Sequence, residues 1–249
     1  MSRTPRTYWV AGTAVLLALL FAAAATVAAA SGDPDPADRT PALHSADAGF
    51  ARDMAVHHQQ AVEMSFVVRD RTQDEAVRSL AYDIANTQAN QRGMLLGWLD
   101  LWGLPKVVAG EPPMAWMAPS EGSGGHDQHG GSSSGSGSSG SGDAGAAAAG
   151  GSGGHGGHGA ARPGALMSGM ATKEEIAQLG AASGRDAEVL YLQLMTDHHV
   201  GGVAMARGCA EQCETPAERD LARGMVEAQR SELTLMADML KQRGAAPRG

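Results

Sequence analysis

The sequence predicts an all-α protein, an antiparallel four-helix bundle made of two copies of one helical hairpin. Three observations support this prediction: the chain repeats itself, its apolar residues recur at helical spacing, and signals for β-strands are scarce. Aromatic residues make up only 4% of the chain, and little of the sequence alternates between polar and apolar residues. One hairpin is too small to bury its apolar stripe alone, so the two hairpins are expected to pack face to face.

The first 30 residues have the order of an export segment. Two arginines precede a long apolar run from Tyr8 to Ala30, which ends in small residues. This order predicts a signal peptide at 1–30, cleaved after about Ala30. The run is also long enough to cross a bilayer, so an uncleaved membrane anchor is the alternative. In both cases the chain after it, which starts with a short exposed segment at 31–44, is expected to be extracellular or anchored to the outer face of the cytoplasmic membrane.

Two stretches of the chain are copies of each other. With an offset of 141 residues and no gap, residues 47–103 align with residues 188–244. The aligned pairs are Phe50 with Tyr191, Met54 with Met195, His57 and His58 with His198 and His199, Met64 with Met205, Gln88 with Gln229, and Gln91 with Glu232. One unit was therefore duplicated, and the two repeats are expected at 45–104 and 170–244.

Each copy carries start and stop signals for two helices. Ser45 or Asp47 can cap a first helix that runs to about Arg71. The stretch 72–75 has the capping-box order, a threonine followed three residues later by a glutamate, and Gly103 provides the stop of a second helix. These signals predict one helical hairpin in the first copy.

The second copy uses the same kinds of signal. Residues 215–218 combine a threonine cap, a proline at the first helical position and an acidic third residue, and Gly244 ends the last helix. A shorter helix is predicted to begin at Thr172, which opens another capping box, and to end at about Leu179. The second hairpin is therefore preceded by one short helix.

Residues 105–169 are predicted to be a flexible linker rich in glycine, serine and histidine. The part from Ala118 to about Gly164 cannot bury enough apolar surface to offset the entropy lost on ordering. Methionines and histidines nevertheless occur there in pairs three residues apart: Met114 and Met117, His126 and His129, His155 and His158, Met167 and Met170. These pairs are either an accident of composition or weak ligands that capture metal for the bundle.

The two cysteines allow two interpretations. Cys209 and Cys213 are four residues apart, and outside the cytoplasm a nearby pair is usually a disulfide. A bridge across one helical turn is geometrically awkward, however, because disulfides require particular Cα and Cβ separations. A reduced pair available to a soft metal is therefore the alternative, and the spacing does not decide between them.

Charge and motifs exclude other classes of function. The formal net charge is −8 and no basic stripe follows the N-terminus, so a nucleic-acid partner is not expected. The sequence offers no nucleophile with its base, no phosphate loop and no cofactor fingerprint. No catalytic residue is assigned, and a protein without enzymatic activity is expected.

Two short motifs carry the candidate chemistry, MAVHHQQAVEM at 54–64 and MTDHHVGGVAM at 195–205. At about 100° per residue, the histidines and methionines of each motif gather on one helical face, which is expected to point into the bundle. The small residues Ala61, Gly201 and Gly202 would let a neighbouring helix or an ion approach closely.

A metal explains these motifs better than core packing does. Methionine at helical spacing is more often core filling than a ligand. Adjacent histidines, in contrast, are poor core residues, since each ring brings two nitrogens that need partners. Imidazole with thioether favours Cu(I) or Cu(II), whereas zinc or iron fits this donor set less well. The candidate ligands are Met54, His57, His58, Met64, Met195, His198, His199 and Met205.

Polar residues on the second helix of each copy are candidate supports. Gln88 with Gln91, and Gln229 with Glu232, are three residues apart and share a helical face. They either orient an imidazole or form an exposed polar face. Asp197 precedes the second pair of histidines and is a candidate oxygen ligand, so the two motifs need not be equivalent.

The motifs resemble the DUF305 family. The shared pattern is an aromatic residue, a methionine, two histidines, a small residue and a methionine on one helix, followed by Gln with Gln or Glu on the next. The resemblance covers about 45–104 and 170–244. It implies an exported bacterial protein with a ferritin-like helical bundle, with copper binding and copper tolerance in some members, and it implies the same eight ligands.

Two other functions stay open. A ferritin-like bundle can house a di-iron oxidase, for which Glu63 and Glu232 are the available carboxylates, fewer than such sites use. The other is a structural or interaction module of the cell envelope whose histidines make polar contacts or sense pH. The expected partner is a metal ion, with membrane contact only through the N-terminal apolar segment. Whether the motifs share one ion, and whether the chain forms a homo-oligomer, are not decided by the sequence.

Overall fold

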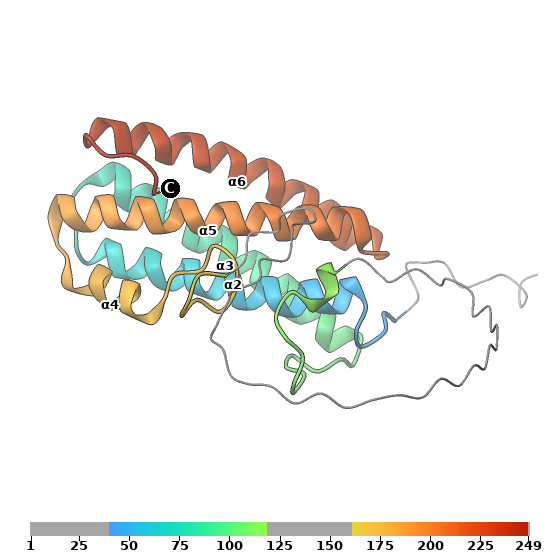
Figure 1. Ribbon diagram of the computed structural model, residues 1–249. Coiled ribbons are helices and arrows are strands. Elements are labelled where there is room, and N and C mark those ends of the chain that lie inside the picture. The colour runs from blue at the N-terminus through green and yellow to red at the C-terminus, as the bar shows by residue number, and fades with distance from the viewer. Residues whose placement is uncertain (1–39, 119–160, 249) are drawn as a thin grey trace, which may run out of the picture. The chain divides into compact units, whose positions relative to one another are not determined.

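The computed structural model describes residues 40–118 and 161–248, which form helices and connecting loops (Figure 1). The helices are α2 (Ala46–Arg69), α3 (Glu75–Leu101), the short 3₁₀ helix η2 (Ala115–Met117), α4 (Lys173–Ala181), α5 (Gly184–Gln212) and α6 (Pro216–Gln242). No strand occurs in these two ranges, so the all-α prediction is confirmed. The expected export segment at 1–30 and the linker histidines His126, His129, His155 and His158 lie outside the described residues.

The long helices pack in pairs. Helix α2 packs along α3, and α5 packs along α6. Helix α2 also packs against α5, so the two helices that carry the histidine motifs are in contact. The short helix α4 contacts both α2 and α5 (Figure 1). Within 40–118 and 161–248, no helix is both long enough and apolar enough to cross a membrane.

Helix starts in the first copy differ in part from the prediction. The Ser45 hydroxyl accepts a hydrogen bond from the backbone N–H of Ala48, so Ser45 is the cap of α2. Helix α3 is capped by Asp74, whose carboxylate accepts from the backbone N–H of Val77 at 2.9 Å. The capping box predicted at 72–75 is therefore wrong, because the buried Thr72 donates its hydroxyl to Glu188 on α5 instead.

In the second copy, one of the two predicted caps forms completely. Thr172 and Glu175 make both bonds of a capping box at the start of α4. Thr215 occupies the cap position of α6, with Pro216 in the first turn, but its side chain makes no cap hydrogen bond. Glu218 is fully buried under the helix instead of reaching back to the cap. Gly244 has a φ of +63° after α6, which fits its predicted role as a stop.

The core consists of two apolar clusters. The first contains Met54 of α2 and Met205 of α5, together with Phe50, Leu95 and Leu99. The second contains Met64 and Met195, together with Ile84, Tyr191 and Met236. The first methionine of each motif therefore clusters with the last methionine of the other, and the histidines between them lie in a layer that separates the two clusters.

Both ends of the segment predicted as a linker pack on the helices. The carboxylate of Asp53 accepts hydrogen bonds from the backbone N–H of Met114 at 2.7 Å and from the indole N–H of Trp116 at 3.0 Å. Trp116 is buried edge-on against Phe50, with ring centroids 5.8 Å apart. It fits there because Gly49 has no side chain, since a Cβ on that residue would lie 2.5 Å from the indole.

The second of these ends lies on α2 and α5. The Gln60 side chain exchanges two hydrogen bonds with the backbone of Ala171, at 2.9 and 2.7 Å. The backbone of 168–169 lies directly against Gly201 of α5. Met117, Met167 and Met170 are buried in the first apolar cluster, so these linker methionines act as core residues in this structure.

Candidate metal centre

The two histidine motifs meet inside the protein. The imidazole rings of His57 on α2 and His198 on α5 lie with their centroids 3.7 Å apart and their planes tilted by 32°. The Nε2–H of His198 donates a hydrogen bond to the backbone carbonyl of His57 at 2.9 Å. These two residues occupy the same position in the two copies, so the motifs contribute to a single layer.

His58 and His199 extend this layer on either side. The centroid of the His58 ring lies 6.4 Å from that of His57, and the centroid of His199 lies 6.2 Å from that of His198. All four histidines are completely buried. The layer therefore places four imidazoles in the interior, which is an expensive arrangement unless their nitrogens gain partners.

A carboxylate orients one of the outer histidines. The Nε2–H of His199 donates to the Glu232 carboxylate at 2.6 Å, so Nδ1 is the ring nitrogen that has no hydrogen-bond partner among the described residues. His198 is in the same situation, because its Nε2–H is held by the His57 carbonyl. The contact between Glu232 and His199 has the arrangement by which proteins fix metal-binding imidazoles, while the supporting role of Glu232 at a metal stays a prediction.

Many polar atoms of the layer have no hydrogen-bond partner among the described residues. They comprise both ring nitrogens of His57 and of His58, the Nδ1 atoms of His198 and His199, and the side-chain amide atoms of Gln88 and Gln229. Gly202 allows Gln229 to reach the layer, since a Cβ there would lie 2.5 Å from its Oε1. Unpaired polar atoms at this depth fit a ligand-binding centre better than a packed core.

Burial keeps His57, His58 and His198 uncharged. It lowers the pKa of His57 and His198 well below the ordinary value, and the neighbouring histidines lower it further. For His58, burial and then the proximity of His199 lower the pKa to about 3, although the amides of Gln91 and Gln88 oppose the shift. Neutral imidazoles at pH 7 offer lone pairs, as metal coordination requires.

The four motif methionines are completely buried on the two sides of the layer. Met54 and Met205 belong to one apolar cluster, and Met64 and Met195 belong to the other. Their side chains therefore fill the core. In the sequence they are also the methionines nearest to each pair of histidines, one before the pair and one after it.

Other predicted accessory ligands lie elsewhere. The Asp197 carboxylate pairs with Arg248 at 2.7 Å and lies 3.7 Å from Arg162, so these arginines are its partners in this structure, and its role as an oxygen ligand stays a prediction. Cys209 and Cys213 form a disulfide with their Cα atoms 4.8 Å apart. Of the two interpretations that the spacing left open, the structure has the disulfide. In this oxidised form the pair offers no thiolate, and a role of the reduced cysteines as accessory ligands stays a prediction.

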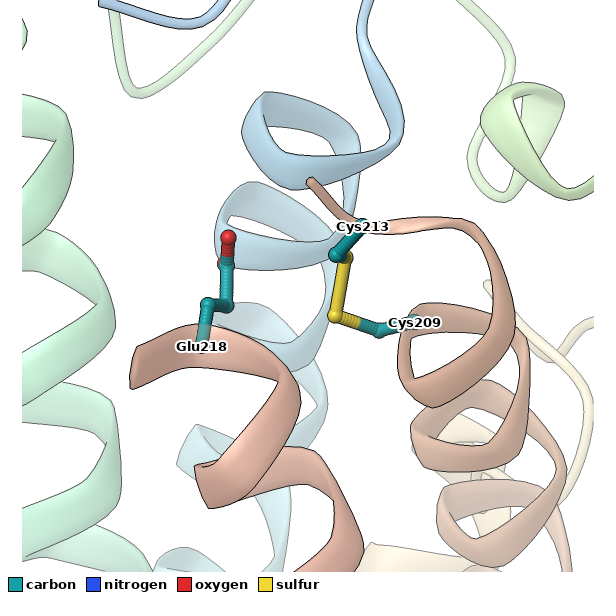
Figure 2. Close-up of side chains that lie close together, drawn as sticks. All are labelled: Cys209, Cys213 and Glu218. Atoms are coloured by element: carbon teal, nitrogen blue, oxygen red, sulfur yellow. A yellow bond between two sulfur atoms is a disulfide. The ribbon is translucent and has the colours of Figure 1, made fainter. Parts of the chain in front are cut away.

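The structure also brings together a group that the sequence did not reveal. Within the described residues, Cys209, Cys213 and Glu218 are the only three His, Cys, Asp or Glu side chains whose donor atoms all lie within 4.8 Å of one another (Figure 2). The histidine layer thus offers pairs of imidazoles, not three clustered nitrogens. The sequence at 215–218 predicted that Glu218 belongs to a helix cap, so its burial beside the cysteines was not expected.

Comparison with known proteins agrees with the fold. The profile of the family described as "Domain of unknown function (DUF305)" matches residues 47–240. A crystal structure of a DUF305 protein from Streptomyces coelicolor, whose name describes it as secreted, is 52% identical, covers 84% of this chain and 99% of that chain, and has a TM-score of 0.63. A DUF305 fragment from Deinococcus radiodurans is 26% identical, covers 81% and 99%, and has a TM-score of 0.54.

A more distant likeness concerns CopM in its Cu(I)-bound form. It is 15% identical, covers 79% of this chain and 96% of that chain, and has a TM-score of 0.49. At this distance the likeness carries no argument about the ligand of the present chain. No curated protein sequence matches the chain.

Proposed function

The chain belongs to the DUF305 family, and from that premise we propose that it is an exported copper-binding protein that sequesters or buffers the metal. The observation that carries the proposal is the contact between His57 and His198, which joins two buried His-His motifs in one layer between methionine-containing clusters. Imidazole and thioether are the donors that copper accepts most readily, and thioether is rarely chosen for zinc.

The residues have separate roles in this proposal. His198 and His199 would bind through Nδ1, because the Nε2–H of each is already donated to an acceptor. His57 and His58 have both ring nitrogens free of hydrogen bonds within the described residues. The buried methionines Met54, Met64, Met195 and Met205 would supply sulfur, while Gln88, Gln91, Gln229 and Glu232 would orient the rings. Bound copper would be held in a water-poor layer, which suits storage.

We also propose that the architecture is an antiparallel, ferritin-like four-helix bundle derived from two duplicated hairpins. In support, α2 pairs with α3 and α5 pairs with α6, as the repeat requires. Equivalent histidines of the two copies touch, and the first methionine of each motif clusters with the last of the other, as antiparallel packing of α2 on α5 requires.

Export is the third part of the proposal. The charged and then apolar order of 1–30 supports it, and a disulfide is typical of proteins outside the cytoplasm. The 52% identical relative from Streptomyces coelicolor is named as secreted. Either cleavage of this segment or its retention as an anchor would place the histidine layer on the outer side of the membrane.

A di-iron oxidase is less well supported by the carboxylates. Glu63 lies exposed on α2, and Glu232 is already hydrogen-bonded to His199. A ferritin-like di-iron centre draws a glutamate from each of two helices and a Glu-x-x-His motif from each of the other two. A pH-responsive structural module remains the competing hypothesis, because it too would bury neutral histidines.

Metal titration of the purified protein lacking residues 1–30 tests the proposal. We expect tight binding of Cu(I) in competition with a coloured chelator, and weaker binding of Zn(II) and Fe(II). Replacing His57, His58, His198 and His199 by alanine should abolish tight copper binding. The matched control is His44→Ala, because His44 is an exposed histidine outside the layer.

The outcomes separate the hypotheses. If the fourfold variant binds copper as tightly as the parent, the site assignment is wrong. If neither protein binds copper and both fold equally well by circular dichroism, the structural module is favoured. The double variants His57→Gln with His198→Gln and His58→Gln with His199→Gln keep polar side chains in the layer, so they retain the test if the fourfold variant does not fold.

A further inference from the structure

A second group of potential ligands lies where α5 passes into α6. Cys209 lies in the last turn of α5 and Cys213 is its final cap, and their disulfide is buried. Only Glu214 and Thr215 separate the disulfide from Pro216, the first residue of α6. Figure 2 shows that Glu218, from the first turn of α6, directs its carboxyl group to the same side as the disulfide.

Glu218 has no structural partner that explains its burial. It is fully buried, and neither of its carboxyl oxygens has a hydrogen-bond partner among the described residues. The neighbouring Asp47 on α2 is different, because its carboxylate accepts from the backbone N–H groups of Glu214 and Thr215, at 3.1 and 2.7 Å. Asp47 therefore has a structural function at the start of α6, whereas Glu218 is a buried carboxyl group without a hydrogen-bond partner among the described residues, and one of its oxygens lies within 4.8 Å of both sulfur atoms.

We propose that reduction of the Cys209–Cys213 disulfide converts this group into a second metal site, which holds a divalent ion such as Zn(II) through two thiolates and the Glu218 carboxylate. The site is separate from the histidine layer and independent of the copper proposal. It exists only in the reduced protein, because the disulfide occupies both sulfurs in the oxidised form.

The geometry suits this ion. Zinc binds thiolate sulfur at ~2.3 Å and carboxylate oxygen at ~2.0–2.2 Å, so two sulfurs on one tetrahedral ion lie about 3.8 Å apart. The three donor atoms already lie within 4.8 Å of one another, and the cysteine Cα atoms are 4.8 Å apart. Small side-chain rotations after reduction are sufficient, and a fourth position stays open for water.

The chemistry balances with a dithiol as reductant. The dithiol gives up two electrons and two protons and becomes a disulfide, while the Cys209–Cys213 bond breaks and yields two thiols. Zinc then forms two metal–sulfur bonds and one metal–oxygen bond, and the protons held by the thiols and the Glu218 carboxyl leave to water. The reductant and the metal ion have a short path to the disulfide, because Gln212 and Glu214 beside Cys213 are exposed.

The two sites offer different donor atoms and therefore favour different metals. The histidine layer offers imidazole and thioether, which favour copper. The group at the α5–α6 junction offers thiolate and carboxylate, both of which are regular zinc ligands. The protein would therefore hold copper in either redox state of its cysteines, and zinc at the junction only after reduction.

Titration of the purified protein before and after reduction tests the inference. The oxidised and reduced forms are titrated anaerobically with Zn(II) by calorimetry, and with Co(II), whose thiolate charge-transfer absorption reports sulfur ligation. We expect one additional equivalent of Zn(II) in the reduced form. The additional site should persist when the four histidines of the layer are replaced, and disappear in the double variant Cys209→Ser with Cys213→Ser.

Glu218→Gln tests the third ligand. The amide keeps the shape of the side chain, but it should weaken Zn(II) binding by at least the roughly 10- to 100-fold expected when a metal site loses a supporting group. Glu214→Gln is the control, because Glu214 is an exposed glutamate two residues before Pro216, the first residue of α6. Equal effects of the two variants would contradict the assignment of Glu218.

Two further results would overturn the inference. One is a reduced protein that binds no more Zn(II) than the oxidised protein. The other is loss of the additional equivalent in the four-histidine variant, which would place it in the layer. Helical content is followed by circular dichroism throughout: if reduction unfolds the chain, Zn(II) should restore the helices, and failure to do so also counts against the site.

Discussion

The four histidines of the layer have chemically different surroundings, although in the sequence they form two identical His-His pairs. His199 is held by the Glu232 carboxylate, whereas the equivalent His58 has the amides of Gln91 and Gln88 nearby and completes no hydrogen bond within the described residues. A carboxylate that accepts an imidazole N–H makes the other ring nitrogen a stronger donor than an amide does. The second copy is therefore expected to supply the tighter ligands.

Changing Glu232→Gln tests this difference. The variant should weaken copper binding by roughly 10- to 100-fold, because the His199 ring loses the negatively charged acceptor that fixes its orientation. Competition with a coloured Cu(I) chelator measures the affinity. Glu227→Gln on the same helix is the matched control, since Glu227 is exposed. An unchanged affinity in the Glu232 variant would show that His199 does not bind the metal.

At the level of helices, two glycines of α5 leave room for groups that pack beside the histidine layer. Glycine inside a helix costs about 0.5–1 kcal/mol relative to alanine, yet Gly201 and Gly202 are adjacent in the middle of α5. A Cβ on Gly201 would overlap the carbonyl oxygen of Ser168, and one on Gly202 would meet Gln229. The helix is weakened there so that the 168–169 backbone and the Gln229 amide can reach the histidines.

A pair of glycine-to-alanine changes separates propensity from packing. Gly201→Ala should destabilise the protein by roughly 1–3 kcal/mol, because the added methyl group overlaps backbone atoms that cannot move alone. Gly224→Ala on α6 has open space around the new Cβ and should stabilise the protein by about 0.5–1 kcal/mol. Urea unfolding of both metal-free variants measures the difference. Similar shifts in both proteins would mean that 168–169 is not packed on α5.

The helices themselves were largely predictable, because caps, stops and apolar spacing are local signals. Apolar residues recur at helical spacing in the sequence, among them Leu80, Ile84, Leu95 and Leu99, and these four are buried on α3. The capping box at Thr72 was predicted wrongly because the hydroxyl of Thr72 donates to Glu188, which lies 116 residues away in the chain. The meeting of His57 with His198 was left open for the same reason: periodicity identifies a face but does not say which helix covers it.

Two features of the candidate sites depended on tertiary structure in another way. The disulfide could not be decided from a four-residue spacing, since it depends on where α5 ends, and α5 ends immediately before Cys213. Trp116 and Met167 lie at the ends of a glycine-rich stretch, and composition alone assigned them to a linker. Each finds an apolar surface on α2 or α5 that only the folded protein provides.

For the whole molecule, the buried histidines make stability sensitive to acid. The pKa values of His57, His58 and His198 are lowered in the folded state, so below about pH 6.5 the unfolded chain binds more protons than the folded one. Unfolding is then favoured by up to about 1.4 kcal/mol per pH unit for each histidine. The metal-free protein should therefore lose stability steeply as the pH falls from 6.5, and bound copper should move this loss to lower pH.

Glu218 has the opposite effect on the alkaline side. Burial first, and then the negative charge of the nearby Asp47, raise the pKa of Glu218 from 4.5 to about 9. Between these values the folded state holds a proton that the unfolded chain has lost, so stability falls as the pH rises, by up to about 1.4 kcal/mol per unit. Between pH 4.5 and 6.5 the three histidines outweigh this single group, whereas above pH 6.5 Glu218 is the one of these four groups that still acts.

The free energy of unfolding of the oxidised, metal-free protein is therefore expected to peak at about pH 6.5. Glu218→Gln carries no titratable proton and retains the shape of the neutral acid, so it should remove the decline between about pH 6.5 and 9. It should also steepen the loss of stability between pH 6.5 and 4.5, because Glu218 no longer opposes the three histidines there. Urea unfolding at half-unit pH intervals under non-reducing conditions gives both curves. Glu214→Gln, which changes an exposed carboxylate just before α6, should keep the peak of the parent. A parent curve that is flat from pH 6.5 to 9 would mean that Glu218 is ionised in the folded protein, and a decline that survives in Glu218→Gln would assign it to another group.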